Sequence, residues 1–290
     1  MNNILVTGGC GFIGGHLVDS LKETYPNINI TVVDDLRTPG RHKVKGVKYY
    51  HESIQDESLV STLKDKYCFD TIFHLANTPR VRRAIEFPAE TIDNNVTSTT
   101  AVCSIALAHS SHIYFAQSSS VQYIEDGTTE NAYTLSKIFA DQVLTLYEEQ
   151  YGVQVTHMFF YSVYGPREAD YGPYSTVVRR FKQRIEADQV LEIYGNGTKQ
   201  RDFTSVSDTV NNMMLMMDDP DVKDGTLRDV HFGAGKPVSI ESIATAFDHL
   251  KVYKFDMPGE AQTTRCLNPY GEYVGDVITY IKEWKNGIRR

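Results

Sequence analysis

Positive charge is scarce in this 290-residue sequence, where 29 lysines and arginines stand against 37 aspartates and glutamates, a formal net charge of −8. Nucleic acids and anionic membranes are bound by basic faces, so this balance argues against both as partners. Long apolar runs are also missing, because no stretch approaches the roughly 20 apolar residues of a membrane span. The chain enters a strand-like segment at Ile4 without a secretory signal pattern. We therefore expect a cytoplasmic protein.

Cysteine is scarce as well. The four cysteines are widely scattered, with no Cys-x-x-Cys pair and no histidine spacing typical of zinc: Cys10, Cys68, Cys103 and Cys266. We expect reduced thiols and no metal site. What the sequence does have is an ordinary globular composition, 41% hydrophobic and 23% charged residues, without low-complexity tracts or repeats.

Short apolar runs alternate with helical patterns through the first two thirds of the chain, which is typical of a parallel sheet with crossover helices. The predicted strands are Ile4–Thr7, Ile30–Val33, Thr71–Leu75, His112–Gln117 and Gln154–Phe160. The predicted helices are Phe12–Tyr25, Leu59–Tyr67, Thr91–Ala108 and Ala132–Tyr151. This pattern predicts a Rossmann-type, doubly wound α/β fold, in which ligands bind beyond the carboxyl ends of the strands.

The pattern changes after Pro166 to loops rich in Gly, Pro and Tyr, followed by a basic amphipathic segment. We assign residues 1–165 to the Rossmann domain and residues 166–290 mainly to a smaller α/β substrate-binding lobe, with residues from about 204 to 235 returning to the domain. The methionine-rich segment "NNMMLMMDDP" is predicted to be the buried face of a helix, because methionine fills irregular gaps in a core.

Three glycines, Gly8, Gly11 and Gly14, follow the first predicted strand and lead into a helix. Glycines at this spacing permit a tight turn and a close approach of the backbone to a pyrophosphate, which the N-terminus of the helix attracts. A glycine triplet alone is weak evidence, so its context decides the interpretation.

The next predicted strand ends in Asp34-Asp35, and Asp34 lies 20 residues beyond Gly14. An acidic side chain at this point accepts hydrogen bonds from the adenosine ribose and repels a 2′-phosphate. The pattern therefore favours NAD as the cofactor. Arg37 keeps NADP open as the alternative, since an arginine there is close enough in sequence to bind a 2′-phosphate.

Tyr133 and Lys137 lie four residues apart near the start of a predicted helix and therefore share one face. A cation beside a phenol stabilises the phenolate and lowers its pKa, which makes the oxygen a proton acceptor near neutral pH. Tyr-x-x-x-Lys by itself occurs by chance in many helices. Together with the glycine turn, it indicates a catalytic site.

A resemblance to a known family runs through nearly the whole chain in collinear order. It rests on "TGGCGFIGGHL", "VVDDL", "DTIFHLAN", "NNVTST", "AQSSSVQY", "YTLSK", "YSVYGPR", "EIYGNGTKQRDFTSVSD" and "HFGAGKPVSIESIA". The sequence resembles the extended short-chain dehydrogenase/reductases of the nucleotide-sugar epimerase and dehydratase group, closest to UDP-sugar 4-epimerases. The resemblance implies NAD as the cofactor and a nucleotide sugar as the substrate.

Matching positions imply roles for single residues. Tyr133 is the implied acid/base, Lys137 holds the nicotinamide ribose and tunes Tyr133, and Ser119 hydrogen-bonds the reacting sugar hydroxyl. Arg201 of "RDF" pairs with the substrate diphosphate, because a guanidinium fork suits phosphate, and Gly195 lies in the turn near the base. The implied cofactor-binding residues are Gly8, Gly11, Phe12, Ile13, Gly14, Asp34, Asp35, Ser53, Ile54, Leu75, Ala76, Asn95, Tyr133 and Lys137.

Two residues after Ser119 bear on the reaction. Relatives that dehydrate or decarboxylate the sugar carry acidic residues there, whereas this chain has Ser120 and Val121. Since elimination needs an extra acid and base, we favour 4-epimerisation through a transient 4-keto sugar, of the UDP-glucose/galactose or the UDP-glucuronate type. A dehydratase, a decarboxylase, an NADPH-dependent reductase and a non-catalytic NAD-binding regulator or scaffold stay open as alternatives.

A narrower hint concerns the sugar. The segment "HLANTPRVRRAIEFP" matches a pattern that uronic-acid epimerases share with other members, and Ser162 stands where a hydroxyl residue stands in some of them. Arg82 or Arg167 is then expected to face a sugar carboxylate. Solvated arginines, or arginines that contact the cofactor, are an equally open interpretation.

The resemblance also implies a homodimer, in which the helices Thr91–Ala108 and Ala132–Tyr151 form a four-helix interface. Two departures from the family leave the identity of the substrate open. The stretch from Tyr123 to Tyr133 is shorter than in most relatives, and Met257 stands where a nucleotide-contacting arginine is common.

Overall fold

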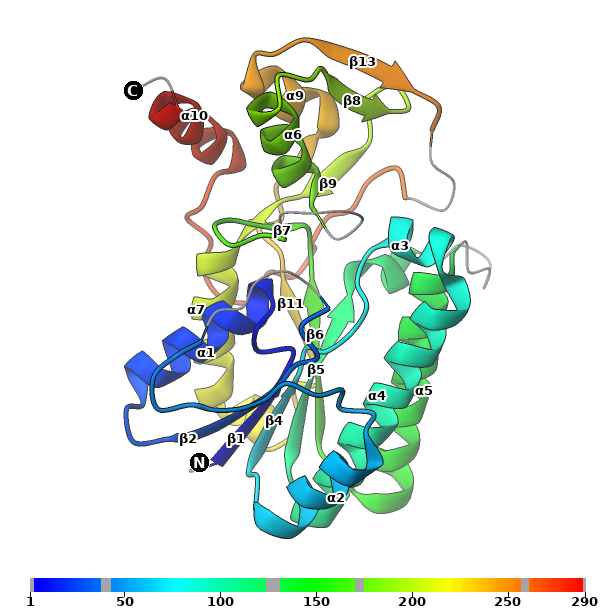
Figure 1. The fold of residues 1–290 in the computed structure, drawn as a ribbon, viewed down its shortest axis with the longest axis vertical. Coiled ribbons are helices and arrows are strands. Elements are labelled where there is room, and N and C mark those ends of the chain that lie inside the picture. Colours follow the sequence, from blue (N-terminus) through cyan, green and yellow to red (C-terminus); the bar gives the residue numbers. More distant parts are fainter. Residues whose placement is uncertain (1–2, 38–42, 124–130, 170–174, 257–260, 289–290) are drawn as a thin grey trace.

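The computed structural model describes residues 3–37, 43–123, 131–169, 175–256 and 261–288. Within these ranges, seven parallel strands form the central sheet of the molecule (Figure 1). They are β1 (Asn3–Thr7), β2 (Asn29–Val33), β3 (Lys48–Tyr50), β4 (Thr71–His74), β5 (His112–Ser118), β6 (Val155–Phe160) and β11 (Asp229–Phe232). Their order is β11-β6-β5-β4-β1-β2-β3, so the chain changes direction between β1 and β4. This confirms the doubly wound α/β fold, which binds ligands at such a reversal.

Alternation along β1 shows how the sheet builds two cores. Ile4 and Val6 point into one buried cluster and Leu5 into the other, because successive side chains of a strand face opposite sides. Figure 1 shows helices on both faces. The helices of this domain are α1 (Phe12–Thr24), α2 (Glu57–Lys66), α3 (Val81–Glu86), α4 (Pro88–His109), α5 (Ala132–Tyr151), α7 (Val206–Asp218) and α8 (Pro220–Lys223), with a 3-10 turn η1 (Ser119–Tyr123).

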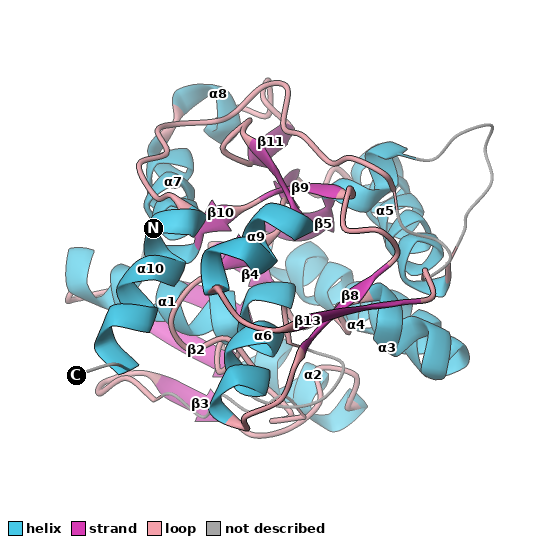
Figure 2. Ribbon diagram, turned by 90° about the horizontal axis from the view of Figure 1, so that it is seen from above, coloured by secondary structure: helices cyan, strands magenta, loops and turns pink. Residues whose placement is uncertain are grey.

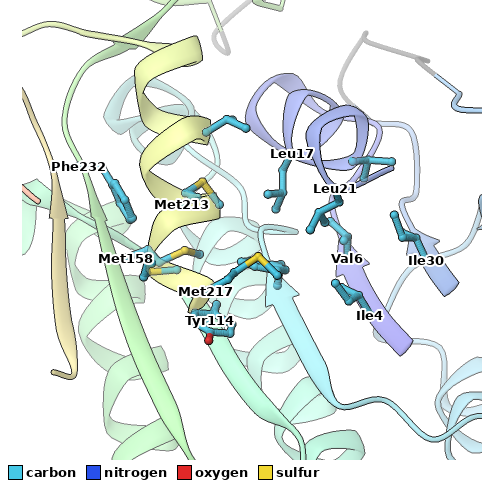
Figure 3. Close-up of a cluster of buried hydrophobic side chains, with 14 of the residues drawn as sticks. Ile4, Val6, Leu17, Leu21, Ile30, Tyr114, Met158, Met213, Met217 and Phe232 are labelled. Atoms are coloured by element: carbon cyan, nitrogen blue, oxygen red, sulfur yellow. The ribbon is translucent and has the colours of Figure 1, made fainter. Parts of the chain in front are cut away.

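The methionine-rich segment forms most of α7, which packs beside α1 on one face of the sheet (Figure 3). Met213 and Met217 are fully buried against Leu17 and Leu21 of α1. Fully burying such side chains stabilises the fold by about 1.5–3 kcal/mol each. The prediction of a buried helix face is confirmed.

A smaller lobe lies beyond the carboxyl ends of the sheet, and Figure 2 looks down on it. Its helices are α6 (Val177–Glu186), α9 (Ile240–Phe247) and α10 (Val277–Ile288). Three two-stranded sheets pair β7 (Val163–Tyr164) with β10 (Thr204–Ser205), β8 (Leu191–Tyr194) with β13 (Lys251–Lys254), and β9 (Gln200–Asp202) with β12 (Pro237–Ser239). A core of its own, including Phe181 and Phe247, holds the lobe together.

Local capping explains where two helices begin earlier than predicted. The Asp56 side chain accepts hydrogen bonds from the backbone N–H groups of Ser58 and Leu59, which starts α2 at Glu57. Pro88 starts α4, because its fixed φ suits the first helical turn. The short elements β3 and α3 were not predicted, since three to six residues carry little periodicity.

The described part of the chain contains neither a membrane-spanning helix nor a cluster of metal-binding side chains. No helix there is both long and apolar enough to cross a bilayer. No group of three or more His, Cys, Asp or Glu side chains there is arranged to hold a metal ion.

Candidate active site

A cavity of about 540 Å³ opens at the carboxyl ends of the central strands, between the sheet and the smaller lobe. Gly8 follows β1, Leu75 follows β4 and Ser119 follows β5, and all three line it. From the other side it is lined by residues of α6, β8 and β9. The cavity therefore has one end at the glycine turn and one end under the smaller lobe.

The glycine turn brings backbone against backbone. Gly8 has a φ of +73°, and a Cβ there would lie 2.8 Å from the backbone of Leu75 and Ala76. A Cβ on Gly14 would overlap the carbonyl oxygen of Gly8. Larger residues at either position are excluded, and the N-terminus of α1 is left open toward the cavity with Gly11 as its cap. Such an N-terminus attracts the negative charge of a phosphate.

Asp34 lies at the end of β2 and is 7% exposed. Its carboxylate accepts hydrogen bonds from the N–H groups of Cys10 and Leu36, each at 2.9 Å. Burial raises the pKa of Asp34, while these two hydrogen bonds act to lower it. The side chain of Arg37 forms a salt bridge of 2.8 Å with Asp35, which ties this arginine to an acidic neighbour.

Lys137 is buried on the inner face of α5. Its Nζ donates to the carbonyl oxygen of Ala116 at 2.5 Å and to Oδ1 of Asn77 at 2.8 Å. Burial lowers the pKa of Lys137 to about 7. Asn77 in turn lies with its amide nitrogen 3.3 Å from Nε2 of His74, whose pKa burial lowers to about 3. A neutral His74 accepts this hydrogen bond and so turns the Asn77 oxygen toward Lys137.

Tyr133 reaches the cavity from the first turn of α5. Burial raises the pKa of its phenol, while a hydrogen bond from Ser118 and the positive charge of Arg80 act to lower it. Ser118 ends β5, and its hydroxyl lies 2.9 Å from that of Ser120. Ser119 is 8% exposed and also lines the cavity. Two adjacent serines therefore line the cavity with Tyr133, and Ser118 is the one that acts on the pKa of its phenol.

Arg80 lines the cavity from the residue before α3, with a backbone φ of +86°. That region favours glycine, and holding another residue there costs on the order of 1–3 kcal/mol. Burial lowers the pKa of the Arg80 guanidinium, while the charges of Glu168 and Tyr133 act to raise it. Glu168 is itself buried, with Oε1 accepting from the N–H of Gly165 at 3.0 Å and Oε2 from the Thr176 hydroxyl.

Cations also line the end of the cavity under the smaller lobe. Nη1 of Arg201 donates to the carbonyl oxygens of Gln200 at 2.8 Å and Ala261 at 2.9 Å, which fixes the guanidinium on β9. Lys199 and Arg180 line the same region. Together these side chains offer a positive surface of the kind that binds a diphosphate.

Most of the predicted site residues meet at this cavity. Those that line it are Gly8, Gly11, Phe12, Ile13, Gly14, Asp34, Asp35, Ser53, Ile54, Leu75, Ala76, Arg82, Ser119, Tyr133, Lys137, Ser162 and Arg201.

Three predicted residues are not among those that line it. Asn95 is fully buried in α4, where it accepts from Thr78 N–H at 2.6 Å and donates to the Ser136 hydroxyl at 2.8 Å. It therefore ties the loop after β4 to α5. Arg167 forms a salt bridge of 2.7 Å with Asp19 on α1.

Gly195, the third, follows β8 with a φ of +76°, in the turn beside the cavity-lining Tyr194. Two predicted features lie outside the described residues: most of the shortened stretch between Tyr123 and Tyr133, and Met257.

Sequence patterns did not single out Asn77, Arg80, Ser118 or Glu168. Asn77 and Ser118 stood at the ends of predicted strands, which was a usable signal, because that edge of the sheet carries the ligand. Arg80 and Glu168 gave no such signal, since the electrostatic interaction between their charges depends on how two loops far apart in the sequence are placed in three dimensions.

Comparison with known proteins accounts for this arrangement. The sequence profile described as the NAD dependent epimerase/dehydratase family matches residues 4–228. The chain belongs to this family. The resemblance identified from the motifs is therefore confirmed, and NAD is the cofactor of the family. The glycine turn, the open end of α1 and the carboxylate of Asp34 fit its pyrophosphate and adenosine ribose.

Relatives within the family differ in their reactions. The chain is 32% identical over 242 residues to a UDP-N-acetyl-alpha-D-glucosaminuronate decarboxylase of Bacillus cytotoxicus, covering 74% of this chain and 71% of the relative. It is 28% identical over 279 residues to a putative UDP-glucose 4-epimerase of Methanocaldococcus jannaschii, covering 90% and 88%.

A solved structure shares the fold over the full length. The UDP-glucose 4-epimerase of Thermotoga maritima, crystallised with UDP-glucose, superposes with a TM-score of 0.85 at 24% identity, covering 99% of this chain and all of that one. The family and the fold are thus established, and the choice of reaction depends on this chain's own residues.

Proposed function

We propose that the protein is an NAD-dependent nucleotide-sugar 4-epimerase that inverts C4 of a UDP-sugar through a transient 4-keto sugar. The observation that carries this proposal is the set of groups around the reacting atom: Tyr133 with Ser118 and Ser119 beside it, followed by Ser120 and Val121 in place of acidic residues. These groups move one proton and hold one hydroxyl, which is what a 4-epimerase needs.

The chain's own residues supply the proton chemistry. Tyr133 takes the proton of the sugar 4-hydroxyl as C4 is oxidised and returns a proton to the oxygen when C4 is reduced. Ser118 and Ser119 hold that oxygen, and Lys137, fixed by Asn77 and Ala116, supplies positive charge. NAD, which the glycine turn and Asp34 would hold, would supply reversible hydride chemistry at C4, and its nicotinamide would add to the charge that favours the phenolate.

Inversion requires the 4-keto sugar to turn so that its other face receives the returning hydrogen. The diphosphate is the fixed end of such a substrate, and Arg201, Lys199 and Arg180 form the positive surface that holds it. Rotation about the bonds between the sugar and the diphosphate then leaves the nucleotide in place.

Elimination and decarboxylation require a second acid or base near C5 and C6. Among the described residues that line the cavity, the acidic ones are Asp34, Asp35, Glu52, Glu168 and Glu192. The first three follow β2 and β3 at the cofactor end, and Glu192 belongs to β8 in the smaller lobe. Of these five residues, Glu168 is the one whose charge acts on Arg80, as the charge of Tyr133 also does.

Two hydrogen bonds fix the carboxyl group of Glu168, because the N–H of Gly165 and the hydroxyl of Thr176 donate to its two oxygens. Burial raises its pKa, while these hydrogen bonds and the charges of Arg80 and Lys182 act to lower it. A carboxyl group whose two oxygens both accept hydrogen bonds from the protein has few sites left for a substrate. This supports epimerisation over the dehydratase and decarboxylase alternatives.

The test is incubation of the purified protein with UDP-, dTDP- and GDP-sugars, with inversion at C4 followed by NMR. We expect inversion of a UDP-sugar without added NADPH and without release of the keto sugar. A reductase would consume NADPH, and a scaffold would turn over none of the sugars. Failure to invert C4 in any sugar of the panel would remove the epimerase proposal.

We further propose that two copies of the chain associate through α4 and α5. These helices pack side by side, and exposed apolar side chains on them include Leu107, Phe139, Leu146 and Tyr151. Covering them with the same face of a second copy removes apolar surface from water. Light scattering is expected to give twice the chain mass of 32.8 kDa. A single-chain mass at working concentration would contradict the dimer.

A further inference from the structure

Residues 261–266 form a connector that runs beside β9 at the diphosphate end of the cavity. The carbonyl oxygen of Ala261 accepts a hydrogen bond from Nη1 of Arg201 at 2.9 Å. The N–H of Thr264 donates to the carbonyl oxygen of Gln200 at 3.1 Å. Ala261, Thr264 and Arg201 also line the cavity. The connector is therefore bonded to the strand that carries the arginine proposed to hold the diphosphate.

Asp202, the next residue on β9, fastens the far end of the connector. Asp202 is fully buried. Its Oδ2 accepts hydrogen bonds from the N–H groups of Cys266 and Gly235, each at 2.8 Å, and its Oδ1 accepts one from Ala234 at 3.1 Å. Hydrogen bonds to a carboxylate are stronger than those between neutral groups. Both ends of the connector are thus held to β9.

The connector is also joined to the turn η1. Tyr123 is the last residue of this turn, which begins at Ser119, and it lines the cavity. Its hydroxyl donates a hydrogen bond to the carbonyl oxygen of Arg265 at 2.7 Å and accepts one from the N–H of the same residue at 2.6 Å. The hydroxyl thus acts as donor and as acceptor toward one backbone residue. Tyr123 therefore ties the turn that carries Ser119 to the connector.

Gln122, the neighbour of Tyr123, holds the same turn to the central sheet. Its Oε1 accepts a hydrogen bond from the hydroxyl of Tyr161 at 2.6 Å, and its Nε2 lies 3.3 Å from Nδ1 of His231 on β11. Tyr161 follows β6 and is 2% exposed. Gln122 therefore sets the turn against the sheet, and Tyr123 sets it against the connector.

A continuous path of hydrogen bonds thus joins two parts of the cavity. It leads from Arg201 along the connector to Arg265, and through Tyr123 to the turn of Ser119. Hydrogen-bonded networks of this kind can carry energetic coupling between distant groups. An enzyme can also use the binding energy of a remote part of its substrate to position the reacting part. In a nucleotide sugar, the remote part is the diphosphate and the reacting part is C4.

We propose that Tyr123 is a positioning residue: it fixes the serine turn to the connector, so that a diphosphate bound at Arg201 also fixes the serine that holds the sugar 4-hydroxyl. This inference rests on the proposed function of the cavity as the site of a nucleotide-sugar 4-epimerase. Tyr123 acts through Ser119 and is neither the acid nor the base. Without the diphosphate, the turn samples more positions and the 4-hydroxyl is held less well.

Hydrogen exchange of the NAD-loaded wild-type protein tests this path without any turnover. The probe is UDP, which has the diphosphate and lacks the sugar, and mass spectrometry reads exchange in peptides that cover residues 119–123 and 261–266. At a UDP concentration of about 100 Kd, we expect exchange in both segments to slow, by up to about 100-fold. Slowing in 261–266 without slowing in 119–123 would overturn the inference, as would no slowing in either segment.

Tyr123→Phe removes the hydroxyl and keeps the ring. Both lost hydrogen bonds are exposed, so water can replace them and the variant is expected to fold. UDP is expected to slow exchange in 261–266 as in wild type and to leave 119–123 unprotected. With a UDP-sugar that the wild-type protein inverts, we expect kcat to fall by about ten- to 100-fold while the Kd of UDP changes by less than about twofold. Unchanged kcat, or retained protection of 119–123, would contradict the role of Tyr123.

Tyr273→Phe is the matched control. The hydroxyl of Tyr273 also donates to a backbone carbonyl, that of Tyr270 at 3.0 Å, and Tyr273 is not among the described residues that line the cavity. We expect wild-type kcat, KM and exchange in this variant. Equal losses in Tyr123→Phe and Tyr273→Phe would show a general effect of a lost tyrosine hydroxyl and would contradict the positioning role.

The outcomes separate the two proposals. Inversion at C4 by a protein whose serine turn gains no protection from UDP removes the role of Tyr123 and leaves the epimerase function standing. Protection of the turn by UDP that depends on Tyr123, without inversion at C4 of any sugar in the panel, removes the epimerase function and keeps the path from Arg201 to the turn.

Discussion

The two ends of the cavity are built in different ways. At the cofactor end, the chain shapes the site with backbone: Gly8 and Gly14 make the turn, and the start of α1 faces the cavity. At the substrate end, the chain uses charged side chains from distant segments, as when the charge of Glu168 after β7 acts on Arg80 before α3. Backbone geometry leaves few choices of residue, whereas a charge cluster can be built in many ways.

The cofactor end serves a task that all family members share, whereas the substrate end decides which sugar one member uses. All members of an NAD-dependent family have the same cofactor to hold, so one backbone solution serves them. Their sugars differ, as shown by a decarboxylase and a 4-epimerase among the relatives of this chain. We infer that changes at the cofactor end abolish function in general, while changes at the substrate end alter which sugar is used.

The largest expected effect belongs to Tyr133, where the two ends meet. Tyr133→Phe removes the proton acceptor, and general acid–base catalysis typically contributes about 10²- to 10⁴-fold to the rate. Turnover is expected to fall by that factor, measured by NMR of the sugar product. NAD binding and the melting temperature serve as controls and are expected to stay close to wild type. Activity within about tenfold of wild type would show that Tyr133 is not the acid/base.

Gly14→Ala tests the cofactor end. The added Cβ would overlap the carbonyl oxygen of Gly8, and overpacking of this kind costs about 1–3 kcal/mol. We expect NAD affinity to fall by about five- to 150-fold in a calorimetric titration, with all sugars affected alike through the lost cofactor. Gly287→Ala, at a helical glycine of α10 with no atom within 4 Å of an added Cβ, is the matched control. Equal NAD affinity in both variants would contradict the close-approach account.

The same contrast explains which parts of the fold and the site could be predicted from the sequence. The strands, the glycine turn, Asp34 and the Tyr133–Lys137 pair were predictable, because each depends on spacing within one segment. Arg80 and Glu168 were not, because nothing in "NTPR" or "YGPRE" reports that the two loops meet or that Arg80 has a positive φ. Asn95 shows a third case: the motif was visible, but the structure uses the residue to fasten Thr78 and not to line the cavity.

A smaller effect distinguishes two neighbouring serines. The motif points to Ser119, whereas the hydroxyl of Ser118 is the one that acts to lower the pKa of Tyr133. A hydrogen bond to a group that becomes charged is worth about 1.5–3 kcal/mol. Ser118→Ala is therefore expected to lower kcat by about ten- to 100-fold and to move the low-pH limb of the pH–rate profile to higher pH, because the phenolate of Tyr133 loses a donor. If Ser119→Ala shows these changes and Ser118→Ala does not, then Ser119 is the serine that assists Tyr133, as the family motif implies.

The smallest expected effect lies outside both ends, at His157 on β6. Its Nε2 is 2.9 Å from Asp141 and its Nδ1 3.2 Å from Asp229. Burial lowers the pKa of His157, but these two carboxylates outweigh burial and raise it to about 9. The charged ring therefore stabilises the fold fully below about pH 6.5, and this contribution is lost as the pH rises through about 9.

We expect the free energy of unfolding of the NAD-bound protein to lose roughly 1–2 kcal/mol over that window, less than the full shift implies, because both aspartates are partly exposed to solvent. Lys137 acts in the opposite direction: its pKa is lowered in the folded state, so its contribution grows with pH above about 7. The difference between wild type and His157→Gln isolates the histidine, in urea titrations at several pH values. A difference that does not change with pH would contradict the assignment.

The most direct test of the central claim follows one UDP-sugar in D2O by NMR. The account predicts that C4 inverts, that the sugar keeps all its carbons, and that the hydrogen on C4 carries no deuterium, because the same hydride returns. Loss of carbon dioxide, a 4-keto-6-deoxy product, or deuterium at C4 would each contradict epimerisation by Tyr133 through a transient 4-keto sugar.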